Sequence, residues 1–157
     1  MNEANPPGLV LALDLGTKCG WAVGGKGVII SGVIDLKPTR FESAGMRFIR
    51  LLGFLKTLHE QTPVALVVVE EVRRHRGTDA AHIYGGLLGA MQAWAEENGV
   101  PYTAQPVGTI KKWACGKGNA GKDDVIASIE MAGFKPRDDN EADALALLHL
   151  QMGMKLA

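Results

Sequence analysis

The sequence has few cysteines, no excess of either charge and no long apolar run, and each absence excludes a class of protein. Its two cysteines, Cys19 and Cys115, lie far apart and match no zinc-binding or Cys-x-x-Cys spacing. Lysine and arginine together number 17, as do aspartate and glutamate, so bulk charge favours no particular partner. An apolar run such as 64–69 is far shorter than the roughly 20 residues of a membrane helix, so we expect no association with a membrane.

The composition is that of a folded chain. With 157 residues, 46% of them apolar and 22% charged, the chain can bury a sizeable core, and intrinsic disorder is excluded. We expect a single domain over residues 1–157, with a flexible N-terminal tail at 1–8. That tail has neither the basic nor the apolar region of a signal peptide, and few cysteines are typical of a reducing compartment. The predicted location is therefore the cytoplasm.

The spacing of apolar residues and glycines predicts an α/β fold. Three closely spaced strands come first, with Gly24, Gly25 and Gly27 in a hairpin turn between the last two. Thr78 and Gly99 are the expected N-cap and C-terminal stop of one helix, while 111–115 is helical or irregular. The predicted strands are 9–13, 20–23, 27–35, 64–69 and 102–105, and the predicted helices are 41–59, 78–98, 122–131 and 139–152. This order, βββαβαβαα, requires a mixed five-stranded sheet with helices on both faces.

Two of these strands end in acidic side chains. Asp14 ends the first strand, and Glu70 and Glu71 end the strand at 64–69. Because side chains alternate along a strand, only one of the two glutamates can share a face with Asp14. A carboxylate after an apolar strand loses solvation unless it is paired or holds a cation, although a turn or capping role for Asp14 is an equal alternative.

A third group of acids begins the last helix. Asp143 lies four residues after Asp139 and three after Asn140, so each pair shares a helical face. The helix continues as an apolar Ala/Leu segment, which would pack on the core and carry these side chains inward. Asp138, and also Asp139, could instead simply stabilise the helix N-terminus, but Asp143 lies one turn further in.

Together these acids predict a metal centre. Carboxylates held close to one another cannot all stay ionised without a cation, and oxygen ligands alone select magnesium or manganese. Two such ions are the usual arrangement for hydrolysing a phosphodiester. The predicted ligands are Asp14, Glu70, Asp139 and Asp143, with Asn140 as a weaker, neutral alternative through its carbonyl oxygen.

Two basic segments flank these acids in the sequence. The first is RRHR at 73–76, directly after the acidic strand end, and the second is 111–122, which contains four lysines and no acid. Either could be an ordinary solvated surface, but together they favour phosphate binding. The predicted DNA-contacting residues are Arg73, Arg74, Arg76, Lys111, Lys112, Lys117 and Lys122.

Two phosphate-loop patterns are coincidental. The segment 116–123 (GKGNAGKD) fits a P-loop spacing, but Asp123 stands where a hydroxyl residue should bind magnesium, and no strand precedes it directly for a dinucleotide fold. The segment 14–20 (DLGTKCG) resembles the phosphate loop of actin-like ATPases, whose two large domains exceed 157 residues. We therefore expect no nucleotide cofactor.

Four segments, in this order and spacing, resemble RuvC-type Holliday-junction resolvases, particularly phage-like members. They are LALDLGTKCGWA, VVVEEV, KKWACGKGNAGKDDV and DDNEADALALL, and the resemblance spans roughly residues 9–150. It implies a ribonuclease H-like fold and a homodimer that binds four-way DNA junctions and makes paired nicks with magnesium or manganese. It also implies a cytoplasmic, nucleoid-associated protein of a bacterial or phage-infected cell.

The resemblance also assigns roles residue by residue. Asp14 and Glu70 match the first two metal ligands, Asp143 matches the final aspartate, and Lys122 and Lys111 match basic residues that contact the scissile region. One departure is Asn140, which stands where familiar bacterial members have an aspartate. Asp139 is the favoured replacement for that ligand, with Asp138 and Asn140 left open.

The implied reaction is attack of a metal-activated water on phosphorus, with Lys122 stabilising the developing charge. Two alternatives stay open. One is another ribonuclease H-like nuclease, acting on RNA–DNA hybrids or flaps, and the other is a catalytically impaired junction-binding protein. A strip of small residues at 85–93 could contact a second subunit, but packing of this strip on the sheet is the favoured interpretation.

Overall fold

The computed structural model describes residues 8–25 and 27–154. The expected flexible tail lies outside these residues except for Gly8. The strands are β1 (Leu9–Asp14), β2 (Lys18–Gly25), β3 (Val28–Asp35), β4 (Val64–Glu71) and β5 (Tyr102–Pro106). The helices are α1 (Met46–Gln61), α2 (Thr78–Asn98), α3 (Val107–Cys115), α4 (Lys122–Met131) and α5 (Asp139–Met152). None of the helices in the described part of the chain is both long and apolar enough to cross a membrane.

The five strands form one mixed sheet, as predicted, and their order in the sheet is β3-β2-β1-β4-β5. β1, β2 and β3 pair antiparallel, whereas β4 and β5 run parallel to β1. The strands β1, β4 and β5 therefore end at the same edge of the sheet, here called the carboxyl edge. Since β2 runs against β1 and β3 runs against β2, β2 begins at this edge and β3 ends there.

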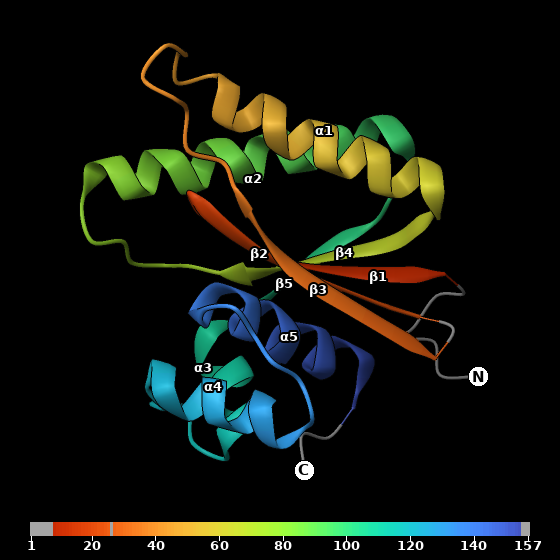
Figure 1. Cartoon of the computed structure of the whole chain (residues 1–157), viewed down its shortest axis with the longest axis vertical. Coiled ribbons are helices and arrows are strands. Elements are labelled where there is room, and N and C mark those ends of the chain that lie inside the picture. The colour runs from red at the N-terminus through yellow and green to blue at the C-terminus, as the bar shows by residue number, and fades with distance from the viewer. Residues whose placement is uncertain (1–7, 26, 155–157) are drawn as a thin grey trace.

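Helices cover both faces of the sheet (Figure 1). α1 and α2 pack on one face, against residues such as Leu11 and Leu13 of β1. α3, α4 and α5 pack on the other face, against Val10 and Ala12. The alternation of side chains along β1 thus supplies two separate hydrophobic cores, as expected for a strand that is buried on both faces.

Besides shifts of one or two residues at the ends of several elements, the structure differs from the predicted elements at three places. Residues 107–115 form a full helix, α3, which the predicted order omitted. α1 begins at Met46 rather than 41, because hydrogen bonds to the Glu42 carboxylate hold the preceding residues in a loop. The N-cap of α2 is Gly77, and no side chain caps that terminus, so the cap assigned to Thr78 was wrong.

The strip of small residues on α2 divides between two faces. A Cβ on Gly86 would lie 2.6 Å from the ring of Phe48, so this residue packs inside the subunit, but against α1 and not on the sheet as predicted. A Cβ on Gly85 or Gly89 would meet nothing within 4 Å, and Ala93 is exposed. The favoured interpretation, packing inside the subunit, is therefore wrong for these three residues, because they lie on the solvent side of the helix.

Candidate metal centre

Three of the predicted ligands meet at the carboxyl edge of the sheet. Carboxylate oxygens of Asp14, Glu70 and Asp143 lie within 4.8 Å of one another. Asp14 ends β1, Glu70 lies near the end of β4, and Asp143 lies in the second turn of α5. Glu70 shares the α5 face of β4 with the buried Leu66 and Val68, as the period of two requires.

The other glutamate of the pair faces away from this cluster. Glu71 is half-buried and accepts a hydrogen bond of 3.1 Å from Nε of Arg73, which is itself exposed. Only one of the two glutamates could share a face with Asp14, and in the structure this residue is Glu70.

The electrostatics of the three carboxylates show what the cluster lacks. Burial raises the pKa of Asp14 well above its usual range, and the charges of Glu70, Asp143, Asp139 and Asp138 raise it further. Burial followed by the charges of Glu70 and Asp139 raises the pKa of Asp143 to about 7, although Lys111 and Lys122 oppose this. Burial also raises the pKa of Glu70, again opposed by Lys111. The three carboxylates therefore cannot all stay ionised by themselves, and a bound cation would relieve the repulsion between them.

A glycine allows α5 to approach the sheet. Gly20 of β2 lies opposite Asp14 in the β1–β2 register. A Cβ on Gly20 would overlap the carbonyl oxygen of Asn140 and lie 2.9 Å from the backbone nitrogen of Glu141. The first turn of α5 therefore packs backbone against backbone on β2, which brings Asp143 beside Asp14.

Side chains at the start of α5 fix this position. Asp138 is the N-cap, and its Oδ1 accepts a hydrogen bond of 2.9 Å from the backbone N–H of Glu141. Glu141 is buried, and its carboxylate accepts hydrogen bonds from the Ser31 hydroxyl (2.8 Å) and the Arg137 N–H (2.7 Å). Neither Gly20 nor Glu141 was among the predicted site residues. The signal for Glu141 was a charged residue inside an otherwise apolar Ala/Leu helix.

The candidates for a fourth ligand occupy different surroundings. Asp139 lies outside the group of three, but its charge raises the pKa of both Asp14 and Asp143. Its Oδ2 forms an ion pair of 3.0 Å with Nζ of Lys122. The side-chain amide of Asn140 donates to Asp138 Oδ2 at 3.2 Å.

The two basic segments meet around this centre, although they lie far apart in the sequence. Lys111 of α3 acts electrostatically on Glu70 and Asp143, and Lys122 begins α4 beside Asp139. The charge of Arg76, from the loop after β4, lowers the pKa of Lys122 against the dominant raising effect of Asp139. Lys111 and Lys122 thus lie near the carboxylates, and Arg76 lies near Lys122.

The remaining predicted DNA-contacting residues have other surroundings. Lys117 lies 3.6 Å from Asp124, and Arg73 pairs with Glu71. Lys112 lines a hollow of about 440 Å³ between α3 and α4, together with Trp113. Arg74 is exposed in the loop after β4.

The fold is ribonuclease H-like, and its carboxylates cluster at the carboxyl edge of the sheet. These two features place the protein in the class of metal-dependent nucleases. No protein-family model matches the chain. It is 35% identical over 133 residues to the crossover junction endodeoxyribonuclease RuvC of Thermus thermophilus, covering 80% of each chain. It is 30% identical over 146 residues to the enzyme of the same name from an Anaeromyxobacter species, covering 88% of this chain and 70% of that one. The chain therefore belongs to the RuvC family.

Solved structures agree with this assignment. The Thermus thermophilus RuvC structure matches with a TM-score of 0.69 and 31% identity, over 93% of this chain and 97% of that one. The same protein in complex with a Holliday junction substrate matches with a TM-score of 0.73 and 28% identity, over 93% and 96%. A yeast mitochondrial Holliday junction resolvase shares the fold alone, with a TM-score of 0.65 at 14% identity.

Proposed function

We propose that this protein is a divalent-metal-dependent endonuclease that resolves four-way DNA junctions. The observation that carries the proposal is the cluster of Asp14, Glu70 and Asp143 at the carboxyl edge of a RuvC-family fold. The relatives are named as crossover junction endodeoxyribonucleases, and one solved relative holds a Holliday junction.

The residues of the cluster fit magnesium or manganese. All three supply carboxylate oxygens, and among the described residues no histidine or cysteine belongs to the group. We propose two ions per subunit, held by Asp14, Glu70 and Asp143, with Asp139 completing the set. Such ions supply an activated water and stabilise the leaving oxygen of a phosphodiester.

The cations around the cluster would act on the DNA itself. Lys122 is positioned to exchange its ion pair with Asp139 for the charge that develops on the scissile phosphate. Lys111 and Arg76 would hold neighbouring phosphates at the same edge. Phosphates further from the cluster would be contacted by Lys112, Lys117, Arg73 and Arg74.

We propose a homodimer, because two opposing nicks require two centres. The exposed strip Gly85, Gly89 and Ala93 recurs every four residues on α2 and would let a second copy approach closely. Sedimentation at nanomolar to micromolar concentration tests this, and a monomer throughout that range would contradict it. We place this dimer in the cytoplasm at the nucleoid, where its substrate is found, and treat 1–157 as one domain.

A panel of DNA substrates tests the proposed activity. The full chain is incubated with magnesium and either four-way junctions, flaps, RNA–DNA hybrids or linear duplexes. Symmetric nicks in the junction alone support the proposal. Cutting of hybrids or flaps would support a different ribonuclease H-like nuclease, and junction binding without cleavage would indicate an impaired binding protein. The Asp14→Asn variant is the control for contaminating nuclease, because it removes a central carboxylate.

Three substitutions decide the fourth ligand. Asp139→Asn should reduce cleavage about 100-fold or more across magnesium and manganese concentrations, because it removes the carboxylate that would complete the ligand set beside Asp143. Asp138→Asn should cut nearly normally, because asparagine is an equally good N-cap. Asn140→Asp should cut as well or better. A normal Asp139→Asn enzyme with a dead Asp138→Asn enzyme would contradict the assignment.

A further inference from the structure

The loop at 36–45 leaves the carboxyl edge at the end of β3, leads to α1 and presents an aromatic side chain to solvent. Phe41 is 85% exposed, more than any other large apolar side chain in the described residues. β3 ends at this edge, and the N–H of Leu36 donates to the carbonyl of Thr17, just after β1, at 2.7 Å. The loop is thus attached to the turn that follows Asp14.

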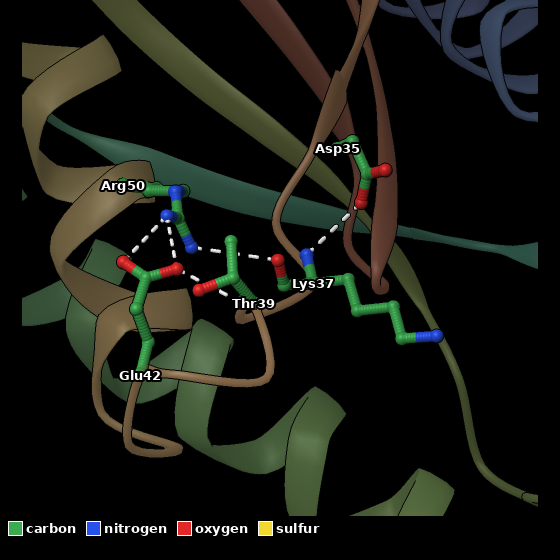
Figure 2. Close-up of polar contacts among 5 residues, drawn as sticks. All are labelled: Asp35, Lys37, Thr39, Glu42 and Arg50. Carbon is green, nitrogen blue, oxygen red and sulfur yellow. Dashed lines mark hydrogen bonds and ion pairs between the residues drawn. The ribbon is translucent and has the colours of Figure 1, made fainter.

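Polar contacts hold this loop in one conformation, as Figure 2 shows. Nη2 of Arg50 in α1 donates to both carboxylate oxygens of Glu42, at 2.6 and 2.7 Å. The same carboxylate accepts from the N–H of Thr39 at 2.8 Å, and Nη1 of Arg50 donates to the carbonyl of Lys37 at 3.4 Å. The hydrogen bonds from Arg50 and then Thr39 lower the pKa of Glu42 to about 2, so this anchor stays ionised at any physiological pH.

Glu42 in the loop and Asp35 just before it both accept hydrogen bonds, whereas the cationic side chains of the loop are exposed. Glu42 is paired with Arg50, and Oδ1 of Asp35 accepts a hydrogen bond of 3.0 Å from the N–H of Lys37. The side chains of Lys37 and Arg40 are exposed. The guanidinium carbon of Arg40 lies 4.7 Å from the centre of the Phe41 ring, so a cation covers one ring face while the other is open to solvent.

An open aromatic face beside two cations suits a nucleobase with its flanking phosphates. Aromatic rings stack on single-stranded bases of any sequence, and arginine adds attraction to both the base and the backbone. A protein partner is less favoured, because the residues on either side of Phe41 in the loop, Arg40 and Glu42, are charged. β3 ends at the same edge as β1, so the loop begins on the side of the sheet where the carboxylates lie.

We propose that Phe41 stacks on an unpaired or splayed base of the branched DNA, with Arg40 and Lys37 contacting adjacent phosphates. The proposal rests on the proposed function, because it takes the DNA to lie along the carboxyl edge. Stacking is interrupted where the arms of a junction cross, so a base there is displaced at lower cost than a base within a duplex.

Fluorescence from 2-aminopurine placed beside the crossing point tests the stacking directly. The full chain is titrated in EDTA, without cleavage, onto a labelled four-way junction and onto a linear duplex. Phe41→Ala should weaken junction binding roughly 5- to 100-fold and abolish the change in 2-aminopurine fluorescence, while duplex binding changes little. Phe41→Trp should restore both signals.

The matched control is Val28→Ala, at the opposite end of β3, because Val28 is also an exposed apolar residue, at 60%. It should bind and report like the unaltered protein, and circular dichroism should show all variants folded. The proposal would be overturned if Phe41→Ala bound the junction as tightly and gave the same change in 2-aminopurine fluorescence. Loss of self-association in that variant would instead assign Phe41 to a protein contact. A parent protein that binds junction and duplex equally would instead contradict the proposed function.

Discussion

Substituting Gly20 with alanine should damage the metal centre without touching any ligand. Gly20 lies opposite Asp14 in β2, and its missing Cβ is the space that the first turn of α5 occupies. The atoms that an alanine would meet are the backbone of Asn140 and Glu141. Because these are not flexible side-chain ends, only a movement of α5 or of β2 can relieve the contact.

The size of that movement follows from the geometry. The added Cβ would lie 2.9 Å from the Glu141 nitrogen, whereas ordinary contact begins at 3.4 Å, so α5 must shift by at least about 0.5 Å. The overlap with the Asn140 carbonyl requires more. Overpacking of this kind costs about 1–3 kcal/mol of unfolding free energy. A shift of about 1 Å in Asp143 can cost on the order of 100-fold in rate.

We therefore expect Gly20→Ala to fold, to lose about 1–3 kcal/mol of stability, and to cleave junctions roughly 10- to 100-fold more slowly at saturating manganese. Calorimetric titration with manganese should show a weaker affinity. The control is Gly53→Ala, because a Cβ on Gly53, in α1, meets nothing within 4 Å. That variant should gain up to about 1 kcal/mol and bind manganese normally. Unaltered manganese affinity and cleavage in Gly20→Ala would refute the positioning argument.

Three further outcomes follow from the charges around the centre. The pKa of Asp143 is raised to about 7, so between about pH 4 and 7 the folded, metal-free protein retains a proton that the unfolded chain has released. Its unfolding free energy, measured by urea denaturation in EDTA, should therefore fall as the pH rises through this window, and the slope should be reduced in Asp143→Asn. Lys111→Ala combined with Lys112→Ala should weaken junction binding and flatten its dependence on salt by about one log–log unit per lost phosphate contact; an unchanged slope would remove α3 from the interface. Lys122→Ala should lower the single-turnover cleavage rate more than the binding affinity, and equal losses would reassign Lys122 to anchoring.

That Asp14, Glu70 and Asp143 meet could be predicted from the sequence, because the signals for it are local. Apolar strands that stop at an acid, as at Asp14 and Glu70, place that acid at a sheet edge whatever the surrounding fold. Helical spacing likewise places Asp143 on the buried face of α5. The sheet order then brings β1 and β4 side by side, so strand ends that are distant in sequence become neighbours.

The parts that the sequence did not predict depend on contacts between distant elements. Gly20 matters only because a particular helix packs on it, and a glycine within a strand is equally common at bulges and tight bends. α3 is rich in lysine and follows a proline, so its helical face becomes clear only where Ile110 and Ala114 meet α5. The loop that carries Phe41 looked like the start of a helix, because the anchoring pair of Arg50 and Glu42 spans eight residues and leaves no periodic signal.

The formal net charge of zero does not count against a nucleic-acid partner, because basic residues are concentrated at one edge of the sheet. At the carboxyl edge, three half-buried carboxylates stand among Lys111, Lys122 and Arg76. Without a cation, those carboxylates that stay ionised repel the phosphates that these basic residues would attract. Two divalent ions would add four positive charges to a chain whose formal charge is zero, and would add them beside those basic residues. Metal and DNA should therefore favour each other's binding, and the carboxylates that hold the metal would weaken, without abolishing, the binding of DNA phosphates while the metal is missing.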